Sequence, residues 1–319
     1  MPPLNNNLTG ILSALGAAFL FSFMDMSIKF LSESYALHQI VVIRASIGMI
    51  VLFVVVAPFY GGLALVKTRR LKTHLLRGLC VVTANVAFFL AIAAMPLADA
   101  VAIFFVAPPL ITIMSVVFLH ESVGLRRWVA ICVGLIGVVI IMRPGSESFK
   151  LVALLPLIAA LGYSTLHILT RKLGPTEHPV TMTFYIQLIF ILVSLLIGLT
   201  VGDGRLSGSG DPSLEFLFRR WVPPKAGDLI LFLAIGLSST GGAFLISLAY
   251  SRCEAGLAAS FEYVALPLSV FWGIVVFADW PDGTAILGIT LIVSAGLYMF
   301  WREALSRHQL VGDYPPRPD

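Results

Sequence analysis

The chain has 319 residues, of which 58% are hydrophobic and 12% are charged, and its formal net charge is +4. An ordinary soluble domain is about 45 to 50% apolar and about 25% charged, so this composition excludes a soluble globular protein and is typical of a chain embedded in a bilayer. The positive charge does not indicate a nucleic-acid partner, because the sequence has no separate basic soluble module.

Ten apolar segments follow one another along the chain, and several reach the roughly 20 residues with which a helix crosses a hydrocarbon core about 30 Å thick. The fifth segment is short. The leading MPPLNNN lacks a basic n-region, so we expect the first segment to remain as a helix. The sequence therefore predicts an all-α membrane protein with ten transmembrane helices, at residues 9–31, 38–58, 76–95, 98–119, 127–142, 151–170, 181–201, 229–250, 255–278 and 284–301.

Lys and Arg are distributed unevenly between the loops on the two sides of the predicted membrane. Positive loop residues are retained on the cytoplasmic side, so the richer side predicts the orientation. With the N-terminus inside, 13 such residues fall in inner loops and 6 in outer loops, which predicts that both termini are cytoplasmic. The inner residues are Lys67, Arg69, Arg70, Lys72, Arg77, Arg126, Arg127, Arg171, Lys172, Arg252, Arg302, Arg307 and Arg317, and the outer ones are Arg143, Lys150, Arg205, Arg219, Arg220 and Lys225.

The two halves of the chain carry similar segments in the same order. AAFLFSFMDMSIK (17–29) resembles AALGYSTLHILTR (159–171) at a constant offset of 142 residues, which aligns Phe21 with Tyr163, Asp25 with His167 and Lys29 with Arg171. Farther along, Asp99 aligns with Glu254 and Glu121 with Asp279. Because each half has five predicted spans, the second half must enter the membrane from the opposite side. This inverted-topology repeat is typical of secondary transporters.

Two longer stretches resemble a known family. ADAVAIFFVAPPLITIMSVVFLHESVGLRRWVAICVGLIGVVIIMRPG (98–145) and EAGLAASFEYVALPLSVFWGIVVFADWPDGTAILGITLIVSAGLYMFWRE (254–303) resemble the ends of the two EamA-type halves of the drug/metabolite transporter superfamily. The resemblance implies two inverted five-helix halves, at 8–145 and 150–303, around a central cavity, with transport of organic metabolites without ATP. It leaves 304–319 as a disordered cytoplasmic tail. The chain departs from the common Gly-Glu pair after the fourth and ninth spans, where it has His120-Glu121 and Ala278-Asp279.

Three charged residues lie inside the first two predicted spans. An isolated charge at the centre of a lipid-exposed helix costs about 2.5 to 3.5 kcal/mol, so we expect these charges to have partners. Asp25 and Lys29 are four residues apart on one helix face, and Arg44 falls at a similar depth in the second span. We predict that the three meet near the outer mouth of the cavity, in substrate contact or gating. The alternative is that Lys29 snorkels to the headgroups while Asp25 and Arg44 form a packing salt bridge.

Glu262 lies about eight residues into the ninth predicted span. A carboxyl group at that depth suits proton coupling or recognition of a cationic group, and the alternative is a neutral, hydrogen-bonded core acid. The remaining candidates are polar residues that either contact substrate or join helices, and aromatic residues that either stack on a substrate ring or pack the core. They are His167, Asn85, Phe105, Tyr163, Tyr263 and Trp272.

The sequence does not favour an enzyme, because it contains no GxxxxGK[ST], HExxH, CxxC or GxSxG motif. The three cysteines form no recognisable disulfide or metal pattern, and we expect no cofactor. We predict a secondary transporter in the inner (plasma) membrane that moves a small charged or zwitterionic metabolite by alternating access. From the resemblance, the substrate is amino-acid-like or S-adenosylmethionine-like. The alternatives are a carrier of a riboflavin-like ring and a membrane subunit of an ATPase or channel complex. Coupling to a proton or counter-substrate, and a monomer or homodimer, are both left open.

Overall fold

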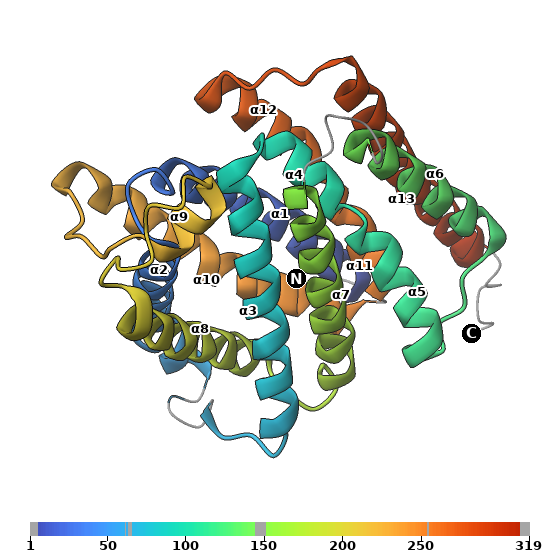
Figure 1. Ribbon diagram of the computed structural model, residues 1–319. Helices are drawn as coiled ribbons and strands as arrows, with labels where there is room; N and C mark the ends of the chain where they lie inside the picture. Colours follow the sequence, from blue (N-terminus) through green and yellow to red (C-terminus); the bar gives the residue numbers. More distant parts are fainter. Residues whose placement is uncertain (1–5, 61, 63–65, 144–150, 254, 313–319) are drawn as a thin grey trace.

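The protein is described by a computed structural model that covers residues 6–60, 62, 66–143, 151–253 and 255–312. Every regular element in these ranges is a helix, and the helices pack side by side in one bundle (Figure 1). Seven helical segments of the described chain are long and apolar enough to cross a membrane, and three shorter apolar helices accompany them. The protein is therefore an all-helical, multi-pass membrane protein.

Each of the ten predicted spans coincides with a helix or with a pair of consecutive helices. The first half of the chain forms α1 (Asn6–Leu31), α2 (Leu37–Val51), α3 (Leu71–Ala94), α4 (Leu97–Phe104), α5 (Ala107–Leu119) and α6 (Leu125–Met142). A π-helix (Leu52–Val56) and a 3-10 turn (Ala57–Tyr60) extend α2. The second half forms α7 (Leu155–Leu173), preceded by a 3-10 turn (Leu151–Leu154), and then α8 (Pro179–Val201), α9 (Pro212–Phe218), α10 (Leu229–Arg252), α11 (Ala255–Phe261), α12 (Ala265–Phe277) and α13 (Gly283–Gly312).

The fourth and ninth predicted spans are both interrupted near their middle. The chain leaves helical geometry between α4 and α5, where Pro108 and Pro109 open the next helix. The matching break between α11 and α12 is a 3-10 turn, Glu262–Val264, shortly before Pro267. Proline lacks an N–H group and is tolerated in the first turn of a helix, so it favours a new start at these points. The breaks fall at matching places of the two halves, and they place loosened backbone in the centre of the bundle.

α5 and α12 also end in the same way. Each is followed by a residue in the left-handed conformation, His120 at φ 56° and Ala278 at φ 55°. The next residue, Glu121 or Asp279, donates its backbone N–H to the carbonyl six residues earlier, at 3.3 and 3.0 Å. A left-handed residue often ends a helix in this way, and it is usually glycine because glycine has no Cβ to strain. The departure from the family's Gly-Glu pair thus falls on two positions whose backbone favours glycine.

Close helix contacts define two ends of the bundle. At one end, the Tyr35 hydroxyl donates to Asp228, before α10, at 2.6 Å. At the other, a Cβ on Gly10 would lie 2.7 Å from the sulfur of Cys253, after α10. α7 ends close to Cys253, because a Cβ on Gly174 would lie 2.9 Å from the Cα of Ser251. α1 and α7 therefore run in opposite directions between what we call the Tyr35 end and the Cys253 end.

α6 and α13 lie side by side at one edge of the bundle (Figure 1). A Cβ on Gly137 of α6 would lie 2.7 Å from the carbonyl oxygen of Gly288 of α13, so the two backbones are in close contact. Small residues permit this approach between membrane helices. α13 also continues to Gly312, nine residues past the predicted domain boundary at 303. Good helix formers in EALSRHQL account for the extension, which replaces the predicted disordered tail over 304–312. Residues 313–319 lie outside the described ranges.

Candidate functional site

A cavity lies between the two halves of the chain. The centre of a water molecule can occupy about 130 Å³ of it, roughly ten times the space that one water needs. The cavity therefore has room for more than a single bound water or ion. Its walls are mostly apolar, and the lining residues from the first half are Ala18, Phe21, Ser22, Met24, Asp25, Arg44, Val81, Ala84, Asn85, Phe88, Phe89, Val101, Phe104, Phe105, Ala107 and Pro108. Those from the second half are Tyr163, Leu166, His167, Ile186, Phe190, Ser239, Ala243, Ile246, Glu262 and Ala265.

Arg44 of α2 is held firmly in the cavity wall, with 1% of its surface exposed. Its guanidinium donates to Asn85 Oδ1 at 2.7 Å and to the sulfur of Met24 at 2.9 Å. The same group lies over the rings of Phe89 and Phe190, 5.3 and 4.7 Å from their centroids. Cation–π contacts of this kind stabilise a desolvated guanidinium. Arg44 thus presents a fixed positive charge to the cavity.

Asp25 of α1 faces the same cavity and is attracted electrostatically by Arg44. Within the described residues, neither a hydrogen bond nor an ion pair closer than 4 Å engages its carboxylate, in contrast to the well-bonded Arg44. A carboxylate has about four lone-pair positions for donors. Asp25 therefore keeps acceptor capacity for a group that enters the cavity.

Lys29 lies elsewhere. Its ammonium group pairs with Asp279 at 3.5 Å, donates to the carbonyl of Met95 at 2.8 Å and lies 5.1 Å from the ring centroid of Phe277. The prediction that Lys29 meets Asp25 and Arg44 is therefore wrong. α1 carries Lys29 one turn beyond Asp25, to the level where α3 and α12 end. Because Lys29 has partners at those helix ends, its ammonium group does not need to extend to the lipid headgroups.

Glu262 lies at the break between α11 and α12 and is 8% exposed. The hydroxyl of Tyr163 donates to one carboxylate oxygen at 2.6 Å, and that of Tyr250 donates to the other at 2.5 Å. Hydroxyl donors on both oxygens satisfy the ionised form of the group. The sequence does not indicate Tyr250, because it lies within the long apolar helix α10 and its spacing of twelve residues from Glu262 has no local signature.

His167 of α7 lies between the same two tyrosines. Its ring centroid is 4.1 Å from that of Tyr163 and 4.0 Å from that of Tyr250. Neither of its buried ring nitrogens has a hydrogen-bond partner among the described residues. Buried polar atoms are usually bonded, so an imidazole left unbonded at a cavity wall is available to an incoming ligand. Asp25, the counterpart of His167 in the repeat, lies in the part of the cavity wall that the first half forms.

The other candidates divide into two groups. Asn85, Phe105 and Tyr163 line the cavity. Tyr263 and Trp272 are absent from its lining: Tyr263 stacks behind Phe105 with centroids 5.1 Å apart, and Trp272 packs against Phe23 and Phe271. The sequence identifies these two as aromatic but does not fix which way the helix turns them.

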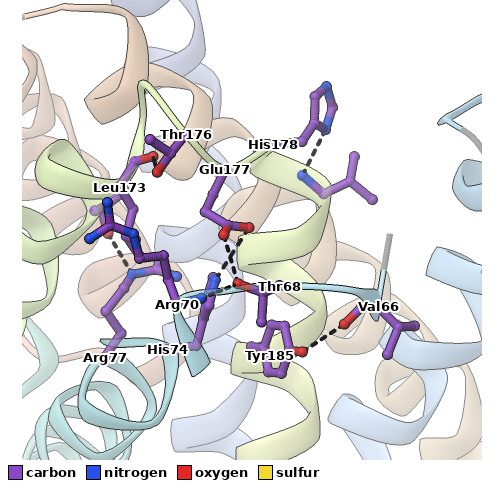
Figure 2. Close-up of polar contacts among 12 residues, drawn as sticks. Val66, Thr68, Arg70, His74, Arg77, Leu173, Thr176, Glu177, His178 and Tyr185 are labelled. Atoms are coloured by element: carbon purple, nitrogen blue, oxygen red, sulfur yellow. Dashed lines mark hydrogen bonds and ion pairs between the residues drawn. The ribbon is translucent and has the colours of Figure 1, made fainter. Parts of the chain in front are cut away.

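A second buried polar cluster lies toward the Cys253 end (Figure 2). Glu177, between α7 and α8, accepts from the hydroxyl of Thr68 at 2.6 Å and lies 3.6 Å from a nitrogen of His74. Arg77, 1% exposed, donates to the hydroxyl of Thr170 at 3.0 Å. Arg77 therefore belongs to the buried part of α3 and not to an inner loop, where its charge is predicted to lie. These bonds tie α3 to α7 and to the turn before α8, and no residue of the cluster lines the central cavity.

The model of the EamA-like transporter family matches residues 8–143 and again 150–302. An S-adenosylmethionine uptake transporter of Rickettsia felis is 28% identical over 306 residues, covering 95% of this chain and 97% of that protein. A riboflavin transporter of Rhizobium johnstonii is 31% identical over 242 residues, covering 76% of this chain and 74% of that protein.

A solved crystal structure superposes with a TM-score of 0.67 at 19% identity, covering 91% of this chain and 96% of the other, which shows a shared fold. The family match covers almost the whole described bundle, and the relatives named above are transporters. The expectation that the chain is not an enzyme is thereby confirmed. With a cavity lined by both halves and a family model that matches each half in turn, the chain belongs to the EamA-like transporter family of small-molecule transporters.

Proposed function

We propose that the protein is a secondary transporter for a small organic zwitterion with a net positive charge, of the S-adenosylmethionine type. The charge inventory of the cavity carries this proposal. Of the described lining residues, Asp25 and Glu262 are acidic and Arg44 is the counterpart base. Two carboxylates against one guanidinium leave one formal negative charge uncompensated. A desolvated, unpaired charge is unfavourable, so the site favours a ligand that brings one net positive charge.

Each charged group of such a ligand has a partner in the cavity. Arg44 is suited to a carboxylate, since a guanidinium presents several donors in a fixed plane. Asp25, on α1, keeps acceptor capacity for an ammonium group of the ligand. Glu262 is held by two tyrosines and is suited to a second cation, which the nearby rings of Phe104 and Phe105 also favour through their π faces. A sulfonium centre with an amino-acid tail provides this set of groups.

A riboflavin-like ring is the second candidate. Seven aromatic side chains line the cavity, namely Phe21, Phe88, Phe89, Phe104, Phe105, Tyr163 and Phe190, and they favour a planar ring. A neutral ring leaves Asp25 and Glu262 without a compensating cation, which is why we rank it second.

The proposed architecture has ten membrane crossings in two inverted halves, residues 8–145 and 150–303, with both termini cytoplasmic in the inner membrane. The opposite directions of α1 and α7 support the inversion, because these are the first long helices of the two halves. The excess of Lys and Arg in the predicted inner loops supports the orientation. Under this orientation the Tyr35 end faces outward and the Cys253 end faces the cytoplasm. Alternating access to a single central cavity then follows from the repeat.

The test is counterflow in liposomes that contain only the purified protein. Vesicles loaded with unlabelled S-adenosylmethionine should accumulate the labelled compound transiently without ATP, and unlabelled riboflavin outside should compete weakly. Strong riboflavin counterflow without S-adenosylmethionine counterflow would favour the second candidate. Dependence on ATP or on a partner protein would contradict a self-sufficient carrier.

A further inference from the structure

Two ion pairs connect the halves of the chain at opposite ends of the bundle. At the Tyr35 end, Lys29 of α1 pairs with Asp279 after α12 at 3.5 Å. At the Cys253 end, Arg171 of α7 pairs with Glu121 after α5 at 3.7 Å. In each pair the base belongs to one half and the acid to the other. The Lys29–Asp279 pair therefore joins α1 of the first half to the end of α12 in the second half. The Arg171–Glu121 pair joins α7 of the second half to the end of α5 in the first half.

The two pairs are equivalents under the repeat. Lys29 aligns with Arg171, and Asp279 aligns with Glu121. Both acids directly follow the left-handed residue that ends a 13-residue helix, and both make the backbone bond to the carbonyl six residues earlier. This recurrence in both halves, with base and acid exchanged between them, distinguishes these pairs from incidental surface ion pairs.

The surroundings of the pairs also correspond. The ammonium of Lys29 lies 5.1 Å from the ring centroid of Phe277, and the neighbouring base at the other end, Lys172, lies 5.8 Å from that of Phe118. Glu121 additionally accepts from the backbone N–H of Ala255, where α11 begins, at 3.3 Å. Glu121 is thus in contact with the start of the broken span of the opposite half as well as with α7.

The pairs lie just beyond the cavity. Asp25 lines the cavity and Lys29 follows it by one turn of α1, while His167 lines the cavity and Arg171 follows it by one turn of α7. Because α1 and α7 run in opposite directions, the pairs lie on opposite sides of the bound-substrate position. Their side chains are partly exposed, 15 and 33% for Lys29 and Asp279 and 30 and 14% for Arg171 and Glu121. Ion pairs that water can reach contribute little free energy, so thermal motion can open them.

We propose that these pairs are the two latches of the transport cycle. Opening of Lys29–Asp279 admits substrate at the Tyr35 end, opening of Glu121–Arg171 admits it at the Cys253 end, and both pairs are formed in the structure described here. The broken helices α4–α5 and α11–α12 are the moving parts, since each latch acid lies at the end of one of them. This inference rests on the proposed alternating access, but it does not depend on which substrate is carried.

Labelling of a cavity cysteine from the two sides of the membrane tests the latches. In a background with Cys80, Cys132 and Cys253 replaced by serine, Ala243→Cys places a reporter on the cavity wall. A membrane-impermeant cationic thiol reagent is applied to right-side-out and inside-out vesicles. Lys29→Gln should raise the labelling rate about three- to tenfold from one side, and Glu121→Gln should raise it by a similar factor from the other, as expected for a shifted two-state equilibrium. The result is informative whichever way the protein is oriented.

Matched variants separate a latch from a general loss of stability. Asp279→Asn and Arg171→Gln should each reproduce the effect of their partner, and Lys29→Asp with Asp279→Lys should restore the reference rates. The control is Asp282→Asn, which removes the ion pair of Arg143 with Asp282, also between the halves but outside the central cavity. It should leave labelling unchanged. The proposal would be overturned if Lys29→Gln and Glu121→Gln raised the labelling rate equally from the same side, or if neither changed it. An increase of the same size in Asp282→Asn would also overturn it.

Counterflow measured on the reporter background keeps the two proposals apart. Opposite labelling shifts without S-adenosylmethionine counterflow would support the latches and contradict the proposed substrate. Counterflow with labelling rates that no latch variant moves would support the substrate and contradict the latches. A melting temperature in detergent for each variant identifies misfolded protein, and either member of a pair serves where the other does not fold.

Discussion

The hydroxyl of Tyr163 donates to Glu262 at 2.6 Å and so joins the first long helix of the second half to the break in its fourth span. Tyr163 is the repeat counterpart of Phe21, which lines the cavity from the other half without a hydroxyl. The two halves thus share a scaffold but differ in chemistry at corresponding positions. The second half presents a tyrosine-bound carboxylate, whereas the first half presents Asp25 opposite Arg44. If the cavity binds the proposed substrate, we expect this asymmetry to give it a defined orientation.

Glu262→Gln should leave the protein folded and inserted while transport collapses. Glutamine retains the shape and accepts from one tyrosine, but it removes the charge that the proposed cation requires. A hydrogen bond to a charged group contributes about 1.5 to 3 kcal/mol, so counterflow should fall by roughly 10- to 100-fold. Counterflow at several pH values, with expression and melting temperature measured alongside, provides the check. Activity within a few-fold of the parent at every pH would instead identify Glu262 as a neutral core acid.

Tyr250→Phe is the companion variant. It removes one of the two donors to Glu262 while the carboxylate and the second donor, Tyr163, remain. We expect a smaller loss of counterflow than in Glu262→Gln, because the charge persists. A loss as large as that of Glu262→Gln would show that the hydroxyl itself carries an essential role in binding or coupling.

Asp25→Asn should weaken binding of cationic ligands selectively. The Asp25 carboxylate lacks a direct partner in the described structure, so its removal leaves no bonded group unpaired and folding should be preserved. S-adenosylmethionine should bind about 10-fold more weakly or worse, whereas a neutral ring such as riboflavin should be unaffected. Ligand-induced shifts in melting temperature measure both, since a ligand that binds the folded state raises apparent stability. Equal loss for the two ligands would place Asp25 in the scaffold.

The proposed orientation predicts where reporters are active. A reporter that works only in the cytoplasm should be active at the end of the chain and silent when inserted at the exposed Ser209, in the connection between α8 and α10. The physical reason is the excess of positive residues in the predicted inner loops. The opposite pattern would reverse the orientation and exchange the sides to which the two latches open. The two latches would still open to opposite sides of the membrane.

The length of the apolar segments is enough to predict where the membrane helices lie, and the repeat is enough to pair Asp25 with His167 as corresponding residues. The partner of Lys29 was not predictable in this way. Asp279 lies 250 residues away, in the other half, and the two meet only because α1 packs against α12. The sequence does not show that Tyr263 and Trp272 lie outside the cavity lining for a related reason, since small rotations about a broken helix decide which aromatic ring faces the cavity. Local pattern fixes helices, whereas packing between the halves fixes the site.

His120→Gly and Ala278→Gly should each stabilise the protein. Both positions have φ near 55°, where a Cβ is strained and glycine is not, and the left-handed conformation costs a non-glycine residue about 1 to 2 kcal/mol. We expect a gain of about 1 kcal/mol for each after the entropy that glycine loses on folding, seen as a higher melting temperature in detergent. Arg143, at φ 48°, offers the contrast, because Arg143→Gly relieves the same strain but removes the pair with Asp282, and its net gain should be smaller. A fall in melting temperature for both His120→Gly and Ala278→Gly would show that the side chains stabilise the helix ends more than the backbone strain destabilises them.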